Sequence, residues 1–313
     1  MKRNKYIEAT QPTIYFIGVT TEQSSIMKVF PKWAKALGLK DAVIKGIDFA
    51  PHSSAEEYRE AVTFIKNDPL SMGALVTTHK IDLFNTCKDL FEYVDPYAEK
   101  LGEVSSISKK DGKLCAHAKD PISSGLALEN FVPENYWTDY DGDVLLLGAG
   151  GSTLAMSVYF SQEKFGNNIP KKIIIANRSV PRLESAKAIL DGIHPDIKFE
   201  YIHNPSPEDN DKTLASLKPH SLIVNATGLG KDGPGSPLTN DCIFPKDSLV
   251  WEINYRGDLL FKHQAEAQAA EKNLHVEDGW IYFIHGWTQV ISEVFHIDIQ
   301  GDLLNKLSDI AKS

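Results

Sequence analysis

The chain has 313 residues, of which 42% are hydrophobic and 24% charged, and its formal net charge is −9. This composition is typical of a soluble globular protein with enough chain for two cores, and the acidic balance argues against binding nucleic acid, which needs a basic surface. The three cysteines form no CxxC pair, which argues against a disulfide framework and a zinc site, and no metal is expected. No segment resembles a signal peptide or a membrane span, so we expect a cytoplasmic protein that does not bind membranes.

The first part of the chain alternates short apolar runs with amphipathic segments. The apolar runs predict strands at 13–19, 41–49 and 73–78. Apolar residues at helical spacing predict helices at 25–39, 54–67 and 81–94. Because the strands alternate with helices, a parallel sheet is expected.

A polar stretch at 132–143 separates this region from a second alternating one. The second region predicts strands at 144–151, 171–178, 221–227 and 248–255. Helices are predicted at 152–166, 180–193, 258–273, 280–295 and 302–312. The direct interpretation is an α/β protein of two domains.

The segment VLLLGAGGSTLA, 144–155, places Gly148 and Gly150 between a predicted strand and a predicted helix, which is the context of a dinucleotide-binding turn. Gly148 permits a tight turn, and Gly150 lets backbone amides approach a pyrophosphate at the start of the helix, where Gly151 and Ser152 also lie. Thr153 replaces the usual small third residue, so looser packing of helix on strand is expected. The alternative is a glycine turn without a ligand.

The next predicted strand ends in Asn177, Arg178 and Ser179, where NAD-binding proteins usually carry a carboxylate for the ribose. A carboxylate would repel a 2′-phosphate, whereas an arginine and small hydroxyls would bind one, so the sequence favours NADP over NAD. Arg182 is a candidate second phosphate ligand. The alternative for Arg178 is a solvated surface arginine.

Lys80 stands between a predicted strand and a predicted helix in the first region. A helix N-terminus and partial desolvation both lower the pKa of a lysine toward values useful for proton transfer. The alternative is a lysine without a catalytic role, whose side chain extends along the protein so that its amine reaches solvent. Asp120 precedes Pro121, which is typical of a helix cap, but its carboxylate could instead hold the amine of Lys80.

A series of segments in chain order resembles the shikimate/quinate dehydrogenase family, from about Gly18 to Phe295. They are GVTTEQSSIMKVFPKWAKALGL, GALVTTHK, KLGEVSSISKKDGKLCAHAKD, LLLGAGGSTLA with IIIANRS, IVNATGLGKDGPGSPL, WEINYRGDLL and DGWIYFIHGW. The resemblance implies an N-terminal substrate-binding domain at 1–125, onto which 280–313 packs back, and a Rossmann-type NADP-binding domain at 126–279. It also implies that substrate binds in the cleft between the domains.

The resemblance also implies roles for individual residues. Lys80 and Asp120 match the acid–base pair: the lysine would be the base in alcohol oxidation and the acid in ketone reduction, and Asp120 would orient it. Substrate contacts are implied for Ser24, Thr77, Ser105, Tyr255 and Gln289, of which Ser24 and Tyr255 would hold a carboxylate. Asn225, Thr227 and Gly279 match positions near the nicotinamide.

Several positions depart from the family pattern. Ile26, Leu75, Ser105 and Gly286 stand where polar substrate contacts are usual, and Gln289 lies one helical turn from the usual glutamine. Because a site built to bind hydroxyls rejects analogues that lack them, the loss of such contacts predicts a relaxed or altered substrate. His79 and His285 are candidates to replace the lost contacts, with a structural role as the alternative for each.

The predicted function is an NADP-dependent oxidoreductase that interconverts a cyclic hydroxy acid and its ketone, as with shikimate and 3-dehydroshikimate. The partner is a small-molecule substrate, and the chain is expected to be a monomer or a homodimer. One alternative is a dehydrogenase of the same fold acting on quinate or on an aminated or less hydroxylated ring acid. Another is a catalytically silent NADPH-binding regulator.

Overall fold

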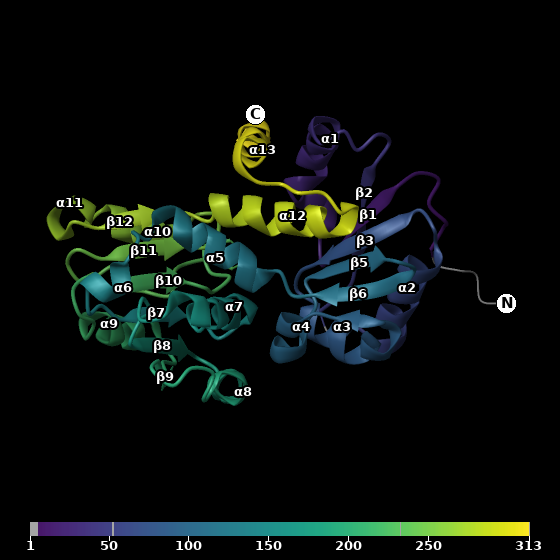
Figure 1. Cartoon of the computed structure of the whole chain (residues 1–313). Helices are drawn as coiled ribbons and strands as arrows, with labels where there is room; N and C mark the ends of the chain where they lie inside the picture. The colour runs from purple at the N-terminus through teal and green to yellow at the C-terminus, as the bar shows by residue number, and fades with distance from the viewer. Residues whose placement is uncertain (1–5, 52, 232, 313) are drawn as a thin grey trace. The chain divides into compact units, whose positions relative to one another are not determined.

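The chain folds into two compact α/β units (Figure 1), as a computed structural model of residues 6–51, 53–231 and 233–312 describes it. The first unit comprises Met1–Lys119 and Gly286–Ser313, and the second comprises Asp120–His285. The sequence predicts boundaries after residues 125 and 279, whereas the units change at Asp120 and Gly286. The predicted class, α/β with two domains, is confirmed.

The first unit is built on a six-stranded mixed sheet in the order β2-β1-β3-β5-β6-β4. Its strands are β1 (Thr13–Gly18), β2 (Val43–Asp48), β3 (Ser71–Val76), β4 (Tyr93–Val94), β5 (Ser106–Lys110) and β6 (Lys113–His117). β1 runs parallel to β2 and β3, while β5 runs antiparallel to β3 and β6. The carboxyl ends of β1 and β3 therefore lie at one edge of the sheet, just before the segments that carry Ser24 and Lys80.

Helices cover both faces of this sheet, with α1 and α13 on one side and α2 and α3 on the other (Figure 1). The helical elements are η1 (Thr21–Gln23), α1 (Ile26–Ala36), α2 (Ala55–Asn67), α3 (Lys80–Cys87), η2 (Lys88–Leu90), α4 (Pro96–Leu101) and α13 (Gly301–Lys312). Local signals fix the starts of α2 and α4. Ser54 and Glu57 form a capping box on α2, and Asp95 caps α4 ahead of Pro96.

The second unit holds a six-stranded sheet that is parallel throughout, in the order β12-β11-β10-β7-β8-β9. Its strands are β7 (Val144–Leu147), β8 (Lys172–Asn177), β9 (Lys198–His203), β10 (Leu222–Asn225), β11 (Leu249–Glu252) and β12 (His275–Glu277). The chain moves outward from β7 in one direction to β9 and in the other to β12. In such a sheet, ligands bind at the carboxyl ends of the strands beside this reversal, here β7 and β10.

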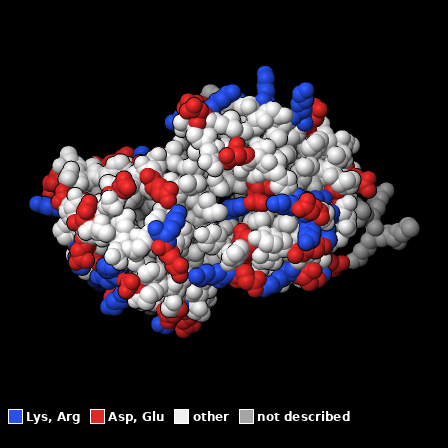
Figure 2. All heavy atoms as spheres, viewed as in Figure 1, with Lys and Arg blue, Asp and Glu red and all other residues white. Residues whose placement is uncertain are grey.

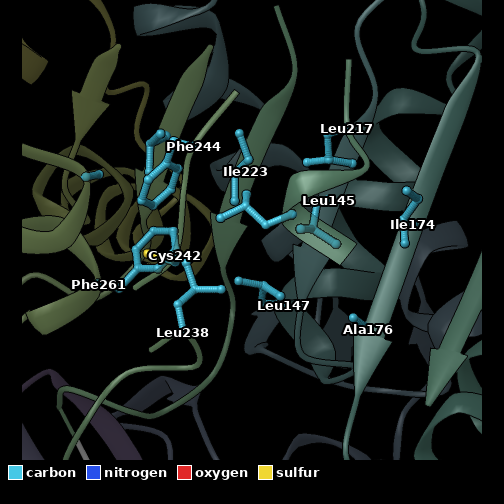
Figure 3. Close-up of a cluster of buried hydrophobic side chains, with 13 residues drawn as sticks. Leu145, Leu147, Ile174, Ala176, Leu217, Ile223, Leu238, Cys242, Phe244 and Phe261 are labelled. Carbon is cyan, nitrogen blue, oxygen red and sulfur yellow. The ribbon is translucent and has the colours of Figure 1, made fainter. Parts of the chain in front are cut away.

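Every residue of β7, β10 and β11 is buried, as expected for strands covered on both faces. The helices are α5 (Asp120–Phe131), α6 (Tyr136–Asp139), α7 (Gly151–Phe160), η3 (Glu163–Phe165), α8 (Val180–Leu190), α9 (Pro207–Ala215), α10 (Leu260–Glu266) and α11 (Ala269–Lys272). Figure 3 shows part of the resulting core, in which Leu145 and Ile223 from adjacent strands lie near Phe244 and Phe261. α12 (Trp280–Phe295) runs from this unit into the first.

Several predicted helices end early in the structure, the one at 152–166 already at Phe160, and two of them are altered by contacts with other segments. The helix predicted at 81–94 ends at Cys87, because the following residues form η2 and then β4, in which Tyr93 pairs with Cys115 of β6. The helix predicted at 258–273 breaks between α10 and α11. There the side chain of Gln268 donates to the Cys242 carbonyl at 2.9 Å and accepts from the Phe244 amide at 3.1 Å.

Three further features concern the surface charges, the cysteines and the length of the apolar helices. On the face drawn in Figure 2, acidic and basic side chains are interspersed over the surface. Cys87, Cys115 and Cys242 are buried free thiols. Within the described ranges, none of the helices combines the length and apolar character needed to cross a membrane.

Candidate active site

The turn after β7 brings the chain close to the end of β10. Gly148 adopts φ +115°, and its amide donates to the Ala176 carbonyl oxygen at 2.8 Å. A Cβ at this position would lie 2.7 Å from the carbonyl oxygen of Ala226, which follows β10. Glycine is therefore required both by the backbone conformation and by the close approach of the two strand ends.

The start of α7 is open to a ligand. Gly150 is its N-cap residue and provides no side chain to the first-turn amides, and a Cβ there would meet nothing within 4 Å. Thr153 is fully buried, and its hydroxyl donates to the Gly148 carbonyl oxygen at 2.8 Å. The expectation of looser packing is therefore wrong, because Thr153 ties the helix back to the turn.

A pocket of ≈ 620 Å³ opens at this turn, entirely within the second unit. It collects residues that follow β7, β8, β9 and β10. Those predicted from sequence to bind the cofactor are Gly148, Gly150, Asn177, Arg178, Ser179, Arg182 and Thr227. Sequence reasoning missed the contributions of Asn204, Ser206, Asn210, Ala226, Gly228, Leu229 and Ser236. The Ser206-Pro207 helix cap after β9 is the one local signal that could have indicated part of this set.

Arg178 and Arg182 give the pocket a cationic rim. Both are exposed, and within the described part of the chain neither guanidinium forms an ion pair. The backbone here is ordered by hydrogen bonds: the Ser179 amide donates to Asn177 Oδ1 at 3.1 Å, and His203 Nε2 lies 3.2 Å from the Arg178 carbonyl oxygen. Two uncompensated guanidinium groups and no carboxylate at the end of β8 suit an anionic ligand.

Asn225 and Gly279, two further residues predicted to bind the cofactor, are not among the residues that line the pocket. Asn225 is fully buried, and its Oδ1 accepts from the Thr227 amide at 3.1 Å and from the Thr227 hydroxyl at 2.6 Å. Thr227, which lines the pocket, is thereby held in place. A Cβ on Gly279 would lie 2.0 Å from the Ile253 carbonyl oxygen, so this glycine permits the chain after β12 to pass close to the end of β11.

Lys80 and Thr77 lie in the first unit at the carboxyl end of β3. Lys80 is the first residue of α3, partly buried, and its amide donates to the Thr77 carbonyl oxygen at 3.1 Å. The Thr77 hydroxyl donates to the Ile17 carbonyl oxygen of β1 at 3.2 Å. Ser24 is half-buried and follows η1, after β1. Lys80 therefore follows the edge of the sheet that β1 and β3 define together.

Ser105 has a supporting role in the structure. It is 2% exposed, and its hydroxyl oxygen accepts from the Lys119 amide at 2.7 Å, immediately before Asp120. Asp120 begins α5 and accepts through its carbonyl oxygen from the Ser124 hydroxyl at 2.7 Å. Because Lys80 and Asp120 belong to different units, their acid–base pairing stays a prediction.

The remaining predicted substrate contacts are Gln289 and Tyr255. Gln289 is half-buried on the part of α12 that belongs to the first unit, where the neighbouring Trp287 packs edge-on against Phe16 of β1 with ring centres 5.1 Å apart. Tyr255 belongs to the second unit, and its ring lies 4.4 Å from that of Phe283 on α12. Both roles in substrate binding stay predictions.

His79 is a structural residue. It is 1% exposed, its Nδ1 lies 2.8 Å from the Tyr58 hydroxyl, and its Nε2 lies 3.2 Å from the Gly18 carbonyl oxygen. Because a carbonyl oxygen only accepts, the ring donates from Nε2, and both nitrogens are engaged within the unit. His285 is also buried, and desolvation holds its pKa below the usual value against the opposing charge of Glu129.

Ile26 and Leu75, two of the positions that depart from the family pattern, are buried hydrophobic residues of the first unit. Ile26 begins α1 and is fully buried, and Leu75 lies in β3. Both contribute to the core, which gives a packing reason for apolar residues at these positions.

The glycine turn, the strand reversal at β7 and the cationic pocket define a dinucleotide-binding α/β protein. No protein-family model matches the chain. A shikimate dehydrogenase (NADP(+)) from Streptococcus thermophilus is 29% identical over 167 residues, 52% of this chain and 53% of that protein, so the chain spans about half the length of this relative. The shikimate dehydrogenase (NADP(+)) of Bacillus cereus strain AH187 is 34% identical over 228 residues, 72% of this chain and 73% of that protein.

A solved structure shares the fold over almost the full length. Shikimate 5-dehydrogenase from Listeria monocytogenes, in complex with shikimate and NAD, matches with a TM-score of 0.72 at 19% identity and covers 99% of both chains. The chain belongs to the shikimate dehydrogenase family, and the resemblance found in its sequence is confirmed.

Proposed function

We propose that the chain is an NADP-dependent oxidoreductase that interconverts a cyclic hydroxy acid of the shikimate type and the corresponding ketone. Membership of the shikimate dehydrogenase family supports the reaction class. The observation that carries the cofactor assignment is the pocket beside β7 and β10, with Arg178 and Arg182 at its rim and no carboxylate at the end of β8. A 2′-phosphate fits this arrangement better than a free ribose hydroxyl.

Within this proposal the chain's own residues bind, orient and move a proton. NADP supplies or accepts a hydride when it is bound. Gly148, Gly150 and the first-turn amides of α7 receive the pyrophosphate, while Arg178 and Arg182 bind the 2′-phosphate. Lys80 takes the proton of the substrate hydroxyl during oxidation and returns it during reduction. Asp120 orients the amine, and Ser24 and Tyr255 hold the substrate carboxylate.

A substrate panel tests the proposed reaction. We expect NADP reduction with shikimate, slower turnover with quinate, and at least about tenfold lower kcat/KM with NAD than with NADP, because a charge-assisted phosphate contact is worth roughly 1.4 kcal/mol or more. The measurement is initial rates with both ring acids, an aminated and a less hydroxylated analogue, their dehydro forms and both cofactors. Turnover only with an aminated or less hydroxylated ring acid would show that this compound, rather than shikimate, represents the substrate. Tight NADPH binding without turnover of any of these compounds would favour the alternative function, a catalytically silent NADPH-binding regulator.

A second test addresses the glycine turn. Gly148→Ala is expected to weaken NADPH binding at least about tenfold, because its methyl group would press on the Ala226 carbonyl oxygen and strain a positive-φ backbone by roughly 1–3 kcal/mol. Isothermal titration with NADPH measures the effect. Gly192→Ala is the matched control, since Gly192 also has a positive φ but its Cβ would meet nothing within 4 Å. Equal affinity of both variants would remove Gly148 from the site.

Cytoplasmic location, and a monomer or homodimer in solution, stay predictions. Sedimentation of the purified protein over a range of concentrations decides between the two assemblies.

A further inference from the structure

Glu252 is a buried carboxylate for which the proposed reaction has no use. It is the last residue of β11, fully buried, and pairs in register with Asn225, the last residue of β10. Among the described residues it forms no ion pair. Burying a carboxylate is costly unless hydrogen bonds compensate, so its partners indicate what it does.

Three N–H groups converge on this carboxylate. Oε2 accepts from Asn225 Nδ2 at 2.6 Å, and Oε1 accepts from the Asn254 amide at 2.8 Å and from Asn254 Nδ2 at 2.6 Å. An ionised carboxylate is acceptor-only, so both side-chain amides must turn their NH2 groups toward it. The orientation of both asparagines is thus set by one charged group.

The two asparagines in turn hold the loop that follows β10. With its Nδ2 facing Glu252, Asn225 presents Oδ1 to the amide and the hydroxyl of Thr227. Asn254 Nδ2 also lies 3.3 Å from the Thr227 carbonyl oxygen and 3.4 Å from that of Leu229. Thr227, Gly228 and Leu229 line the pocket beside the glycine turn.

We propose that Glu252 is a positioning residue for the cofactor, whose carboxylate fixes Asn225 and Asn254 and so holds the loop at 227–229 as a wall of the binding pocket. The inference rests on the proposal that this pocket binds NADP. Glu252 itself does not line the pocket, and it acts only through the two asparagines.

The protonation state of Glu252 decides whether this arrangement holds. Desolvation raises the pKa of Glu252 to about 7, the charge of Asp278 acts in the same direction, and the donors from Asn254 and Asn225 oppose both. Protonation converts one acceptor site into an O–H donor that faces N–H donors. The neutral acid also accepts hydrogen bonds more weakly than the carboxylate does, so the two asparagine amides are held less firmly.

The test compares NADPH dissociation constants of the wild type and Glu252→Gln from about pH 5.5 to about pH 8.5. Glutamine keeps the shape, carries no charge and, like the O–H of the protonated acid, places a donor group (its NH2) among the asparagine donors. We expect the variant to bind about tenfold more weakly at the alkaline end, which is roughly 1.4 kcal/mol, and as well as the wild type at the acidic end. The 2′-phosphate of the ligand itself titrates near about pH 6, so the ratio of the two constants, which cancels this effect, is the quantity to read.

One control variant and two possible outcomes separate a failure of this inference from a failure of the proposed function. Glu277→Gln, on the neighbouring strand β12 and paired with His275, is expected to leave the pH profile unchanged. No NADPH binding by the wild type at any pH overturns the proposed function and this inference with it. Binding with a wild-type to variant ratio that does not change with pH overturns this inference alone.

A second measurement needs no variant and covers the case in which Glu252→Gln does not fold. By linkage, a ligand that requires the ionised carboxylate must lower the pKa of that carboxyl when it binds. Carboxyl-labelled glutamate NMR of the wild type, titrated with and without saturating NADPH, is expected to show one buried carboxyl whose pKa falls in the complex. An unchanged pKa in the complex overturns the proposal.

Discussion

Lys80→Ala is expected to lower kcat at least about a hundredfold, the usual contribution of a general acid–base group, while the NADPH dissociation constant stays within about twofold of the wild type. The physical reason is that the cofactor pocket is built wholly from the second unit, whereas Lys80 begins α3 in the first. Initial rates and isothermal titration on the same preparations measure the two quantities.

Two further variants separate proton transfer from charge at this position. Lys80→Arg keeps the positive charge, but a guanidinium does not deprotonate at ordinary pH, so it should be nearly as inactive as alanine. Lys88→Ala removes a lysine from the same region that is ion-paired with Glu99, and it should retain full activity. Substantial turnover by Lys80→Arg would show that the site needs a cation rather than a proton carrier.

Arg178→Ala is expected to weaken NADP binding by about ten- to a hundredfold, because each charge-assisted contact to a phosphate is worth roughly 1.5–3 kcal/mol. NAD carries no 2′-phosphate, so its binding should change by less than about threefold. The ratio of the two dissociation constants, measured by titration, reports the effect directly. The loss should also shrink at high salt, since the guanidinium is exposed and its field is screened.

Arg59→Ala is the matched control for this experiment. Arg59 is an arginine of the first unit that is ion-paired with Asp89, so its loss leaves the pocket untouched. If Arg178→Ala changed NADP and NAD binding equally, Arg178 would have no role in recognising the 2′-phosphate. Arg182, which lines the same pocket, would then be the next residue to replace.

The nucleotide-binding turn could be predicted from sequence because its requirements are local. An apolar strand, two glycines and an amphipathic helix occupy consecutive positions, and the structure places Gly148 and Gly150 at the pocket as expected. The Asn177–Ser179 segment begins at the last residue of the next strand, β8, so its position was fixed by the same alternation of strands and helices. Both inferences, the glycine turn and the Asn177–Ser179 segment, rest on fewer than about twenty consecutive residues, which is the length over which hydrophobic periodicity predicts strands and helices.

The parts that could not be predicted depend on contacts between distant segments. Residues 81–94 have helical periodicity, but pairing of Tyr93 with β6 turns the end of that stretch into a strand. The Glu252–Asn225–Asn254 network joins the ends of two strands, and nothing in the local sequence distinguishes a buried glutamate there from a surface one. Ser105 illustrates the same limit, since its hydroxyl is used by the Lys119 amide fourteen residues away.

The first unit is completed by residues that the ribosome makes only after the whole second unit. Trp33 of α1 is fully buried and donates from Nε1 to the Leu307 carbonyl oxygen at 2.8 Å, and Phe30 stacks near Phe295. During translation, the second unit, one continuous segment, has been synthesised before these partners exist. The N-terminal segment therefore waits with aromatic surface uncovered, and nascent chains stalled short of Gly286 should be more prone to chaperone capture than the released protein.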